Sequence, residues 1–247
     1  MLGLSSCLSA DYKAVFNNEM SVLLDGTNDY IELDGLASVD GWDSISNAGS
    51  ISIWVKINET SSTGQIIRMQ ADSNNFISIY YHASSNTTRT AYKGGGGTTI
   101  AKSSAAIEED GEWHHVVSTW STTTNKLTLY LDGTIVEAKP NSGPLDEFSG
   151  DISTIDVGQN TSGSSYFDGY VDELSVWNAA LTGAQISTIY NNGVPNDIMT
   201  LNELTPSVRC VGYYRFEDDT SNTVKDHSAY INNGTLVNGP DYTTDAP

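Results

Sequence analysis

The order of apolar and polar residues predicts a chain of short β-strands. The clearest strand is 50–57, whose aliphatic residues alternate with other side chains and therefore share one face. Trp54 lies on the opposite face, so both faces of this strand are expected to be covered. Further apolar runs of strand length, separated by Gly, Asn, Ser and Asp, occur at 21–24, 30–33, 65–69, 76–81, 113–120, 126–131, 134–137, 152–157, 170–177 and 211–216.

Turn and helix signals complete this pattern. Asp132-Gly133 is a typical two-residue hairpin turn, and the four glycines 94–97 predict a loop. A helix is predicted near residues 182–192, because Thr182 and Gln185 form a capping box and Asn192-Gly193 is a typical end. Many short strands and one short helix favour an antiparallel β-sandwich.

Charge narrows the range of partners. The chain has 11 Lys and Arg against 31 Asp and Glu, a net charge of −20, which repels phosphate backbones and argues against nucleic-acid binding. No apolar stretch approaches ~18 residues, so no membrane span is predicted. The acidity is explained either by solubility in a salty medium or by carboxylates that hold calcium.

The two cysteines and the N-terminal sequence bear on the cellular compartment. Cys7 and Cys210 either form a bridge or remain free thiols, and their spacing does not decide between the two. The sequence before Cys7 has no basic residue and no apolar core of sufficient length, so no signal peptide is recognised.

Three motifs resemble a known family. Residues 111–117 followed by 129–133 are similar to the "W-H-H-V … Y-x-D-G" centre of laminin-G-like domains of the concanavalin A-like superfamily. Residues 169–193 resemble the closing motif of that family, and 25–31 resemble its opening motif. The motifs follow the family order over roughly residues 20–195, a layout that pentraxins share. The resemblance implies an all-β, two-sheet antiparallel jelly-roll sandwich.

One departure from the family order concerns the domain organisation. Residues 213–217, 226–228 and 233–236 resemble a segment that usually precedes the opening motif, but here they come last. Chain termini of compact domains often lie close together. We therefore expect an N-terminal arm, 1–18, and a single sandwich domain, 19–247, onto which 208–240 packs back as a permuted segment.

The resemblance also implies a calcium site. Many relatives hold one calcium between the opening and closing motifs, and the matching positions are Asp25, Asp29 and Asp172. In the alternative interpretation, Asp25 and Asp29 cap turns and Asp172 accepts hydrogen bonds from the backbone. A two-calcium site of the pentraxin kind is disfavoured, because loops 72–75 and 159–160 hold amides where carboxylates are needed.

A carbohydrate site needs an exposed aromatic platform beside polar groups. The candidates for such a platform lie near the glycine loop, although tyrosine is equally common in a core or at protein contacts. They are Tyr80, Tyr81, His82, Tyr92 and Tyr166.

Catalysis is not expected. Glu108, Asp110 and Glu112 match the Glu-x-Asp-x-Glu spacing of some glycoside hydrolases, but Glu109 and Gly111 between them suit a turn rather than a catalytic strand. His114 and His115 point to opposite faces of their strand and cannot share one metal.

The resemblance therefore implies a non-enzymatic structural or adhesive module on a virion or cell surface, such as a phage head decoration or tail protein. Its partners would be other chains of an oligomeric assembly, with 1–18 as the anchor, and a glycan. A free carbohydrate-binding lectin is the alternative, and a polysaccharide hydrolase is less favoured.

Overall fold

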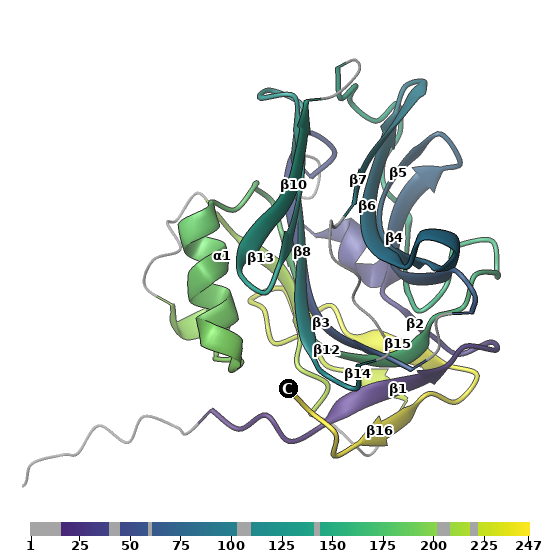
Figure 1. The fold of residues 1–247 in the computed structure, drawn as a ribbon, viewed down its shortest axis with the longest axis vertical. Coiled ribbons are helices and arrows are strands. Elements are labelled where there is room, and N and C mark those ends of the chain that lie inside the picture. Colours follow the sequence, from purple (N-terminus) through teal and green to yellow (C-terminus); the bar gives the residue numbers. More distant parts are fainter. Residues whose placement is uncertain are drawn as a thin grey trace, which may run out of the picture.

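Two antiparallel sheets packed face to face form the protein (Figure 1). The computed structural model describes residues 16–39, 45–58, 61–102, 110–140, 144–201, 208–217 and 222–247. Within these residues each sheet has eight strands, and the aliphatic residues of both inner faces form the core. The predicted β-sandwich with one short α-helix is confirmed.

The first sheet, called sheet A, has the strand order β10-β9-β8-β3-β12-β1-β16, with β13 also paired to β12. Its strands are β1 (Ser21–Asp25), β3 (Ala48–Ile57), β8 (His114–Ser121), β9 (Lys126–Leu131), β10 (Thr134–Pro140), β12 (Asp168–Trp177), β13 (Cys210–Tyr214) and β16 (Asp241–Thr243). The alternation in β3 is as predicted, with its aliphatic residues in the core and Trp54 on the outer face, only 3% exposed.

The second sheet, called sheet B, has the order β14-β15-β2-β11-β4-β5-β6-β7. Its strands are β2 (Tyr30–Glu32), β4 (Gly64–Asp72), β5 (Asn75–His82), β6 (Thr87–Gly94), β7 (Gly97–Lys102), β11 (Thr154–Val157), β14 (Thr223–Val224) and β15 (Gly234–Val237). Short 3₁₀ turns lie at η1 (Asp34–Ser38), η3 (Ala83–Ser85), η4 (Asn191–Gly193) and η5 (Ile198–Thr200).

The hairpin of β6 and β7 was not predicted as a pair of strands, because β6 is mostly polar and has few apolar residues to alternate. The predicted glycine loop is its tight turn: β6 ends at Gly94 and β7 begins at Gly97. A Cβ atom at Gly94 would lie 2.0 Å from the carbonyl oxygen of Asp146, so the close approach of these backbones requires glycine.

The helix α1 (Gly183–Tyr190) covers the outer face of sheet A (Figure 1). Its predicted capping box between Thr182 and Gln185 is present. Its last residue is Tyr190, and Asn191 follows in the left-handed conformation, slightly before the predicted end at Asn192-Gly193. Ile186 and Ile189 bury the apolar stripe of the helix in a second cluster on this face, together with Val117, Trp177, Leu181 and Tyr213. The part of sheet A beneath the helix is therefore covered on both sides.

The C-terminal segment contributes strands to both sheets. β13 pairs with β12, β16 pairs with β1, and β15 pairs with β2. Of the predicted arm, 1–18, only 16–18 belong to the described residues, and Cys7 lies outside them. Cys210 is buried, its thiol donates to the Gly212 carbonyl, and burial raises its pKa.

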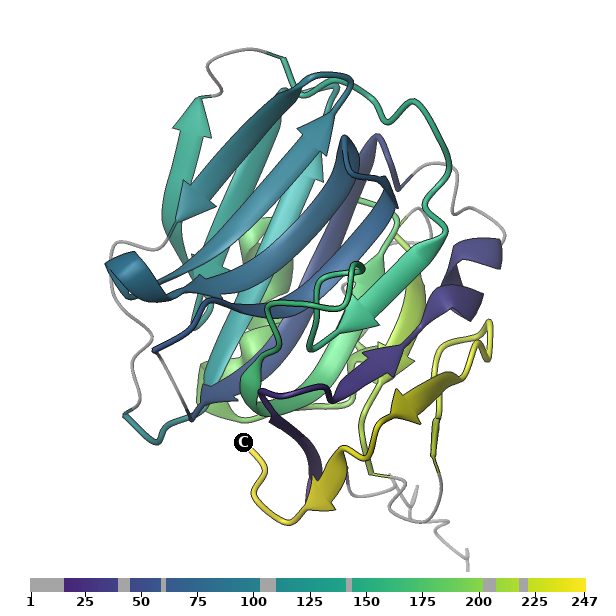
Figure 2. The ribbon, with the colours of Figure 1, turned by 90° about the vertical axis from the view of Figure 1, so that its right-hand side faces the viewer.

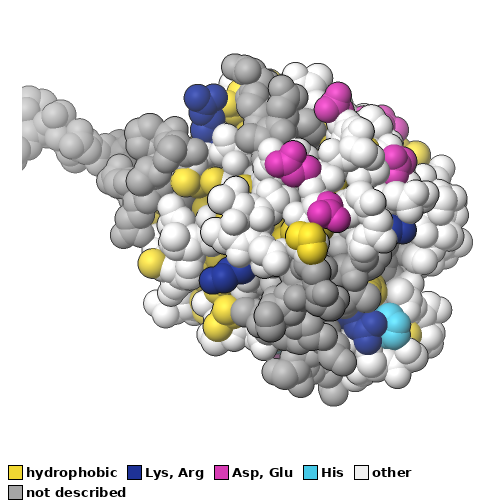
Figure 3. Space-filling model, turned by 90° about the horizontal axis from the view of Figure 1, so that it is seen from above, with side chains coloured by type: hydrophobic (Ala, Val, Ile, Leu, Met, Phe, Trp, Pro, Cys, Tyr) yellow, Lys and Arg dark blue, Asp and Glu magenta, His cyan; other side chains and the backbone are white. Residues whose placement is uncertain are grey.

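No described helix is long and apolar enough to cross a membrane. Seen from above the view of Figure 1, acidic side chains are scattered over the surface, and the described residues show no continuous basic patch there (Figure 3).

Candidate functional site

The outer face of sheet B is not covered by any α-helix of the described chain (Figure 2). Ile77, Ile79 and Tyr81 of β5 point into the core. Because strand side chains alternate, the intervening residues of β5 and its end residue point outward. These outward residues are Phe76, Ser78, Tyr80 and His82.

One row of this face runs across five strands in register. Glu32 of β2 is paired with Asp156 of β11, which is paired with Arg68 of β4, and the row continues through Ser78 to Ala91 of β6. Since neighbouring strands lie about 4.8 Å apart, the part of the row from Asp156 to Ala91 spans roughly 14 Å. Asp156, Ser78 and Ala91 are at most 4% exposed, so the accessible side chains of this row are Glu32 and Arg68.

Arg68 and Phe76 form a stacked pair on this face. The guanidinium carbon of Arg68 lies 3.7 Å from the ring centroid of Phe76, and Nε donates to Gln70 Oε1 at 2.7 Å. Burial against the ring lowers the pKa of Arg68. Within the described chain, no hydrogen bond uses the two terminal guanidinium nitrogens of Arg68. These nitrogens are therefore available to a ligand, while Nε and the ring of Phe76 hold the guanidinium plane in place.

Basic side chains gather on one half of the face. Arg89 and Lys93 are at outward positions of β6, beside Tyr80 and Phe76 in register, and Arg68 lies on β4. The outward positions of β5 and β6 include no Asp or Glu, while Asp72 at the end of β4 interacts with Lys93. This half of sheet B therefore carries three cationic side chains and one carboxylate, in a chain of net charge −20.

Acidic groups lie on the other half. Asp156 is only 4% exposed and accepts a hydrogen bond from Gln159 Nε2 at 3.1 Å. Burial, with Asp34 and Glu32 nearby, raises the pKa of Asp156 to about 6. Burial, with the charges of Asp156, Glu32 and Asp34, raises the pKa of Tyr30. The face therefore has a basic end and an acidic end.

The structure leaves only some side chains of the predicted tyrosine platform exposed. Tyr80 and His82 lie on the face with ring centroids 6.3 Å apart, and Tyr166 is half-buried on the loop before β12. The prediction is wrong for Tyr81 and Tyr92, which are each 1% exposed. Both point inward by strand alternation, and their hydroxyls donate to Asn86 and to the carbonyls of Ser46 and Asp146.

The sequence prediction missed Arg68, Gln70 and Phe76. Their signal was present, because the core residues Ile67 and Met69 alternate with Arg68 and Gln70 along β4. A platform predicted from tyrosine side chains alone does not include an arginine that stacks on a phenylalanine ring.

The structure does not bring the three predicted calcium ligands together. Asp25 pairs with Asp168 in the β1–β12 ladder, so Asp172 lies four residues, roughly 13 Å, farther along β12. Asp25 instead caps its turn by accepting from Thr27 N at 2.8 Å, as the alternative interpretation predicts. Among the described residues no three acidic, His or Cys side chains are grouped to hold a metal. A calcium site stays a prediction without support from this geometry.

Asp172 belongs to a buried acidic pair at an irregularity of β12. The register with β3 shifts between Asp172 and Ser175, and Glu173 has a positive φ of 45°. Asp172 accepts from Asn18 Nδ2 at 2.9 Å and from Glu173 N. Glu173 accepts from Tyr213 Oη and from Arg215 Nε. Burial of two adjacent acids raises the pKa of Asp172 and raises that of Glu173 to about 7.

This pair is expected to make the protein less stable as pH rises between 4.5, the ordinary pKa of glutamate, and about 7. In that range the folded chain holds a proton that the unfolded chain has released, so unfolding becomes easier as pH increases. Glu173→Gln should reduce this decline in the free energy of unfolding by roughly 1–3 kcal/mol. Urea unfolding at the two ends of the range measures it, with the exposed Glu19→Gln as control; an unchanged decline in Glu173→Gln would contradict the assignment.

The two histidines point apart, as predicted. His115 is fully buried, its Nε2 lies 2.7 Å from Ser52 Oγ, and burial lowers its pKa to about 4. His114 lies between Asp132 and Asp110, whose hydrogen bonds raise its pKa. Asp110 also accepts from Glu112 N in the turn before β8, while Glu108 lies outside the described residues.

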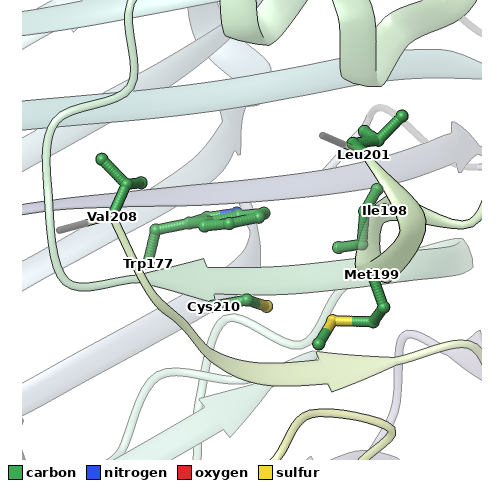
Figure 4. Close-up of a pocket in the computed structure, with 6 residues that line it drawn as sticks. All are labelled: Trp177, Ile198, Met199, Leu201, Val208 and Cys210. Atoms are coloured by element: carbon green, nitrogen blue, oxygen red, sulfur yellow. The ribbon is translucent and has the colours of Figure 1, made fainter. Parts of the chain in front are cut away.

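An apolar pocket of about 160 Å³ lies between β12, β13 and η5 (Figure 4). The two polar side-chain groups in its lining are already engaged: the indole N–H of Trp177 donates to Ser175, and the Cys210 thiol donates to Gly212. The residues that line it are Trp177, Ile198, Met199, Leu201, Val208 and Cys210.

Comparison with protein families gives one match. The pattern of the concanavalin A-like lectin/glucanases superfamily matches residues 25–187, about two thirds of the chain. No curated protein matches the chain closely enough to count as a relative.

Solved structures share the fold at low identity. A candidate carbohydrate binding protein from Bacteroides ovatus is 15% identical with a TM-score of 0.60, and the match covers 94% of this chain but only 62% of that one. Domain 4 of an extracellular arabinanase from Geobacillus stearothermophilus, in complex with arabinotriose, is 20% identical with a TM-score of 0.55, covering 69% and 76% of the two chains. A heptameric pentraxin from Limulus polyphemus is 20% identical with a TM-score of 0.51, covering 72% and 84%.

Proposed function

Since the chain belongs to the concanavalin A-like lectin/glucanases superfamily, we propose that it is a non-catalytic carbohydrate-binding module whose ligand lies on the outer face of sheet B. The observation that carries this proposal is the stacked Arg68–Phe76 pair beside Tyr80 on a sheet face without a helix over it. Aromatic rings can pack on the apolar faces of sugar rings, while Arg68 and Gln70 bind hydroxyl or acidic groups.

The ligand class follows from charge. The half of the face on β4 to β6 carries Arg68, Arg89 and Lys93, although the protein as a whole is strongly acidic. A glycan bearing carboxylate or sulfate groups would be repelled by most of the surface and attracted to this half. The module is therefore proposed to bind acidic polysaccharides. Structural neighbours that bind carbohydrate, such as the arabinanase domain, support the binding function but not this ligand class.

The test is titration calorimetry with two matched ligands, an oligogalacturonate and its methyl ester. The two share one backbone and differ in charge. The proposal expects the acid to bind more tightly, with an affinity that falls as salt is added. Equal binding of the ester would contradict the acidic class, and no binding on a broad array of acidic and neutral glycans would contradict the function. The same titration repeated with a chelator tests the predicted calcium site. Loss of glycan binding in the chelator would show that binding depends on a metal ion.

Assembly with other chains on a virion or cell surface, with 1–18 as anchor, stays a prediction from the sequence resemblance. Residues 1–15 of that arm lie outside the described residues.

A further inference from the structure

A separate pocket lies on the outer face of sheet A, remote from the face of sheet B described above. It encloses about 270 Å³ and has three aromatic side chains in its walls, Trp54, Trp113 and Tyr190. The Tyr190 ring stacks on Trp54 with centroids 5.8 Å apart and planes inclined by 22°. Trp113 is held by its indole N–H, which donates to Asp245 at 3.0 Å. The size suits a small ligand group.

The polar lining of this pocket is anionic. Asp132 lines it and lies 2.9 Å from His114 Nδ1, while Asp110 lies 3.1 Å from His114 Nε2. Glu112 is exposed, and within the described residues no partner of its carboxylate is found. The imidazole of His114 thus contacts two carboxylates, and Glu112 adds a third acidic side chain to the pocket lining. The net charge of these four side chains is negative whether or not His114 is protonated.

Lys56, which pairs with Asp245, does not neutralise the pocket. Lys56 Nζ lies 2.6 Å from Asp245 Oδ2 and 5.1 Å from the ring centroid of Tyr170. Its charge is therefore engaged by a carboxylate and an aromatic ring beside the pocket.

We propose that this pocket binds an organic ammonium group, held against the aromatic walls and next to Glu112 and Asp132. Aromatic faces attract cations through their quadrupole, and the carboxylates add a direct electrostatic attraction. A bare metal ion fits less well, because the described residues include no group of three ligands suited to one. The inference is independent of the glycan face.

Choline and its neutral isostere 3,3-dimethylbutan-1-ol provide the first test, by calorimetry and by tryptophan fluorescence on the full chain. The proposal expects binding of choline and at least tenfold weaker binding of the isostere. N-acetyl-lysine amide distinguishes the source of the ammonium group: binding of this probe in preference to choline would assign the pocket to lysine side chains. Failure of both cations to bind, or equal binding of the isostere, would overturn the proposal.

Two variants locate the site. Glu112→Gln removes one charge from an exposed side chain, and Trp113→Leu keeps an apolar wall without the aromatic face; each should weaken cation binding by roughly three- to tenfold. The exposed Glu147→Gln is the matched charge control. Equal effects of Glu112→Gln and Glu147→Gln would place the cation elsewhere. Because the glycan face lies on the other sheet, oligogalacturonate binding should be unchanged in Glu112→Gln, which separates failure of this inference from failure of the proposed function.

Discussion

Trp120→Ala is expected to lower the free energy of unfolding by about 3–5 kcal/mol. The Trp120 side chain is 1% exposed, and its indole N–H donates to the Ile45 carbonyl at 2.7 Å. Its six-membered ring lies against Gly49, where a Cβ atom would be 2.3 Å from Cζ2. Truncation therefore leaves a cavity between the sheets and an unpaired buried carbonyl.

Urea unfolding followed by circular dichroism measures this effect. Trp120→Phe fills most of the cavity and should cost clearly less than the alanine variant. Gly49→Ala is also expected to destabilise the protein, because the added methyl group would overlap the indole ring of Trp120. A loss below about 1 kcal/mol for Trp120→Ala would show that this contact does not hold the sheets together.

Arg68→Ala is expected to have the largest effect on glycan affinity, a loss of roughly 10- to 100-fold. The substitution removes a charged hydrogen-bond donor and the flat surface that it forms with Phe76. Arg68→Lys should give an intermediate loss, because lysine keeps the charge but not the planar, stacked geometry.

Calorimetry with an acidic oligosaccharide measures both Arg68 variants, and melting temperatures check that they remain folded. Arg209→Ala serves as the matched control, because Arg209 is exposed beside β13. This substitution removes the same charge at a position away from the outer face of sheet B. If Arg209→Ala weakened binding as much as Arg68→Ala, the attraction would come from overall charge rather than from a site.

The sandwich was predictable because its signals are local. The alternation in β3, the Asp132-Gly133 turn and the capping box at Thr182 each specify one element from adjacent residues. The polar strand β6 was not predictable in this way, because it is specified by pairing with β5 rather than by its own pattern.

The candidate site was only partly predictable, because it depends on register between strands. Tyr80 and Tyr81 are neighbours in sequence, but only the burial of one face decides which of them is exposed. Asp25 and Asp172 match a family pattern in sequence, yet the β1–β12 register separates them. Arg68 and Phe76 come from different strands, so their stacking is visible only in the fold.

The most direct measurement of the central claim is the mapping of amide chemical shifts during titration with an acidic oligosaccharide. We expect the perturbed amides to cluster on β4, β5 and β6 around Arg68, Phe76 and Tyr80. Perturbations confined to the outer face of sheet A, with those three strands unchanged, would contradict the account.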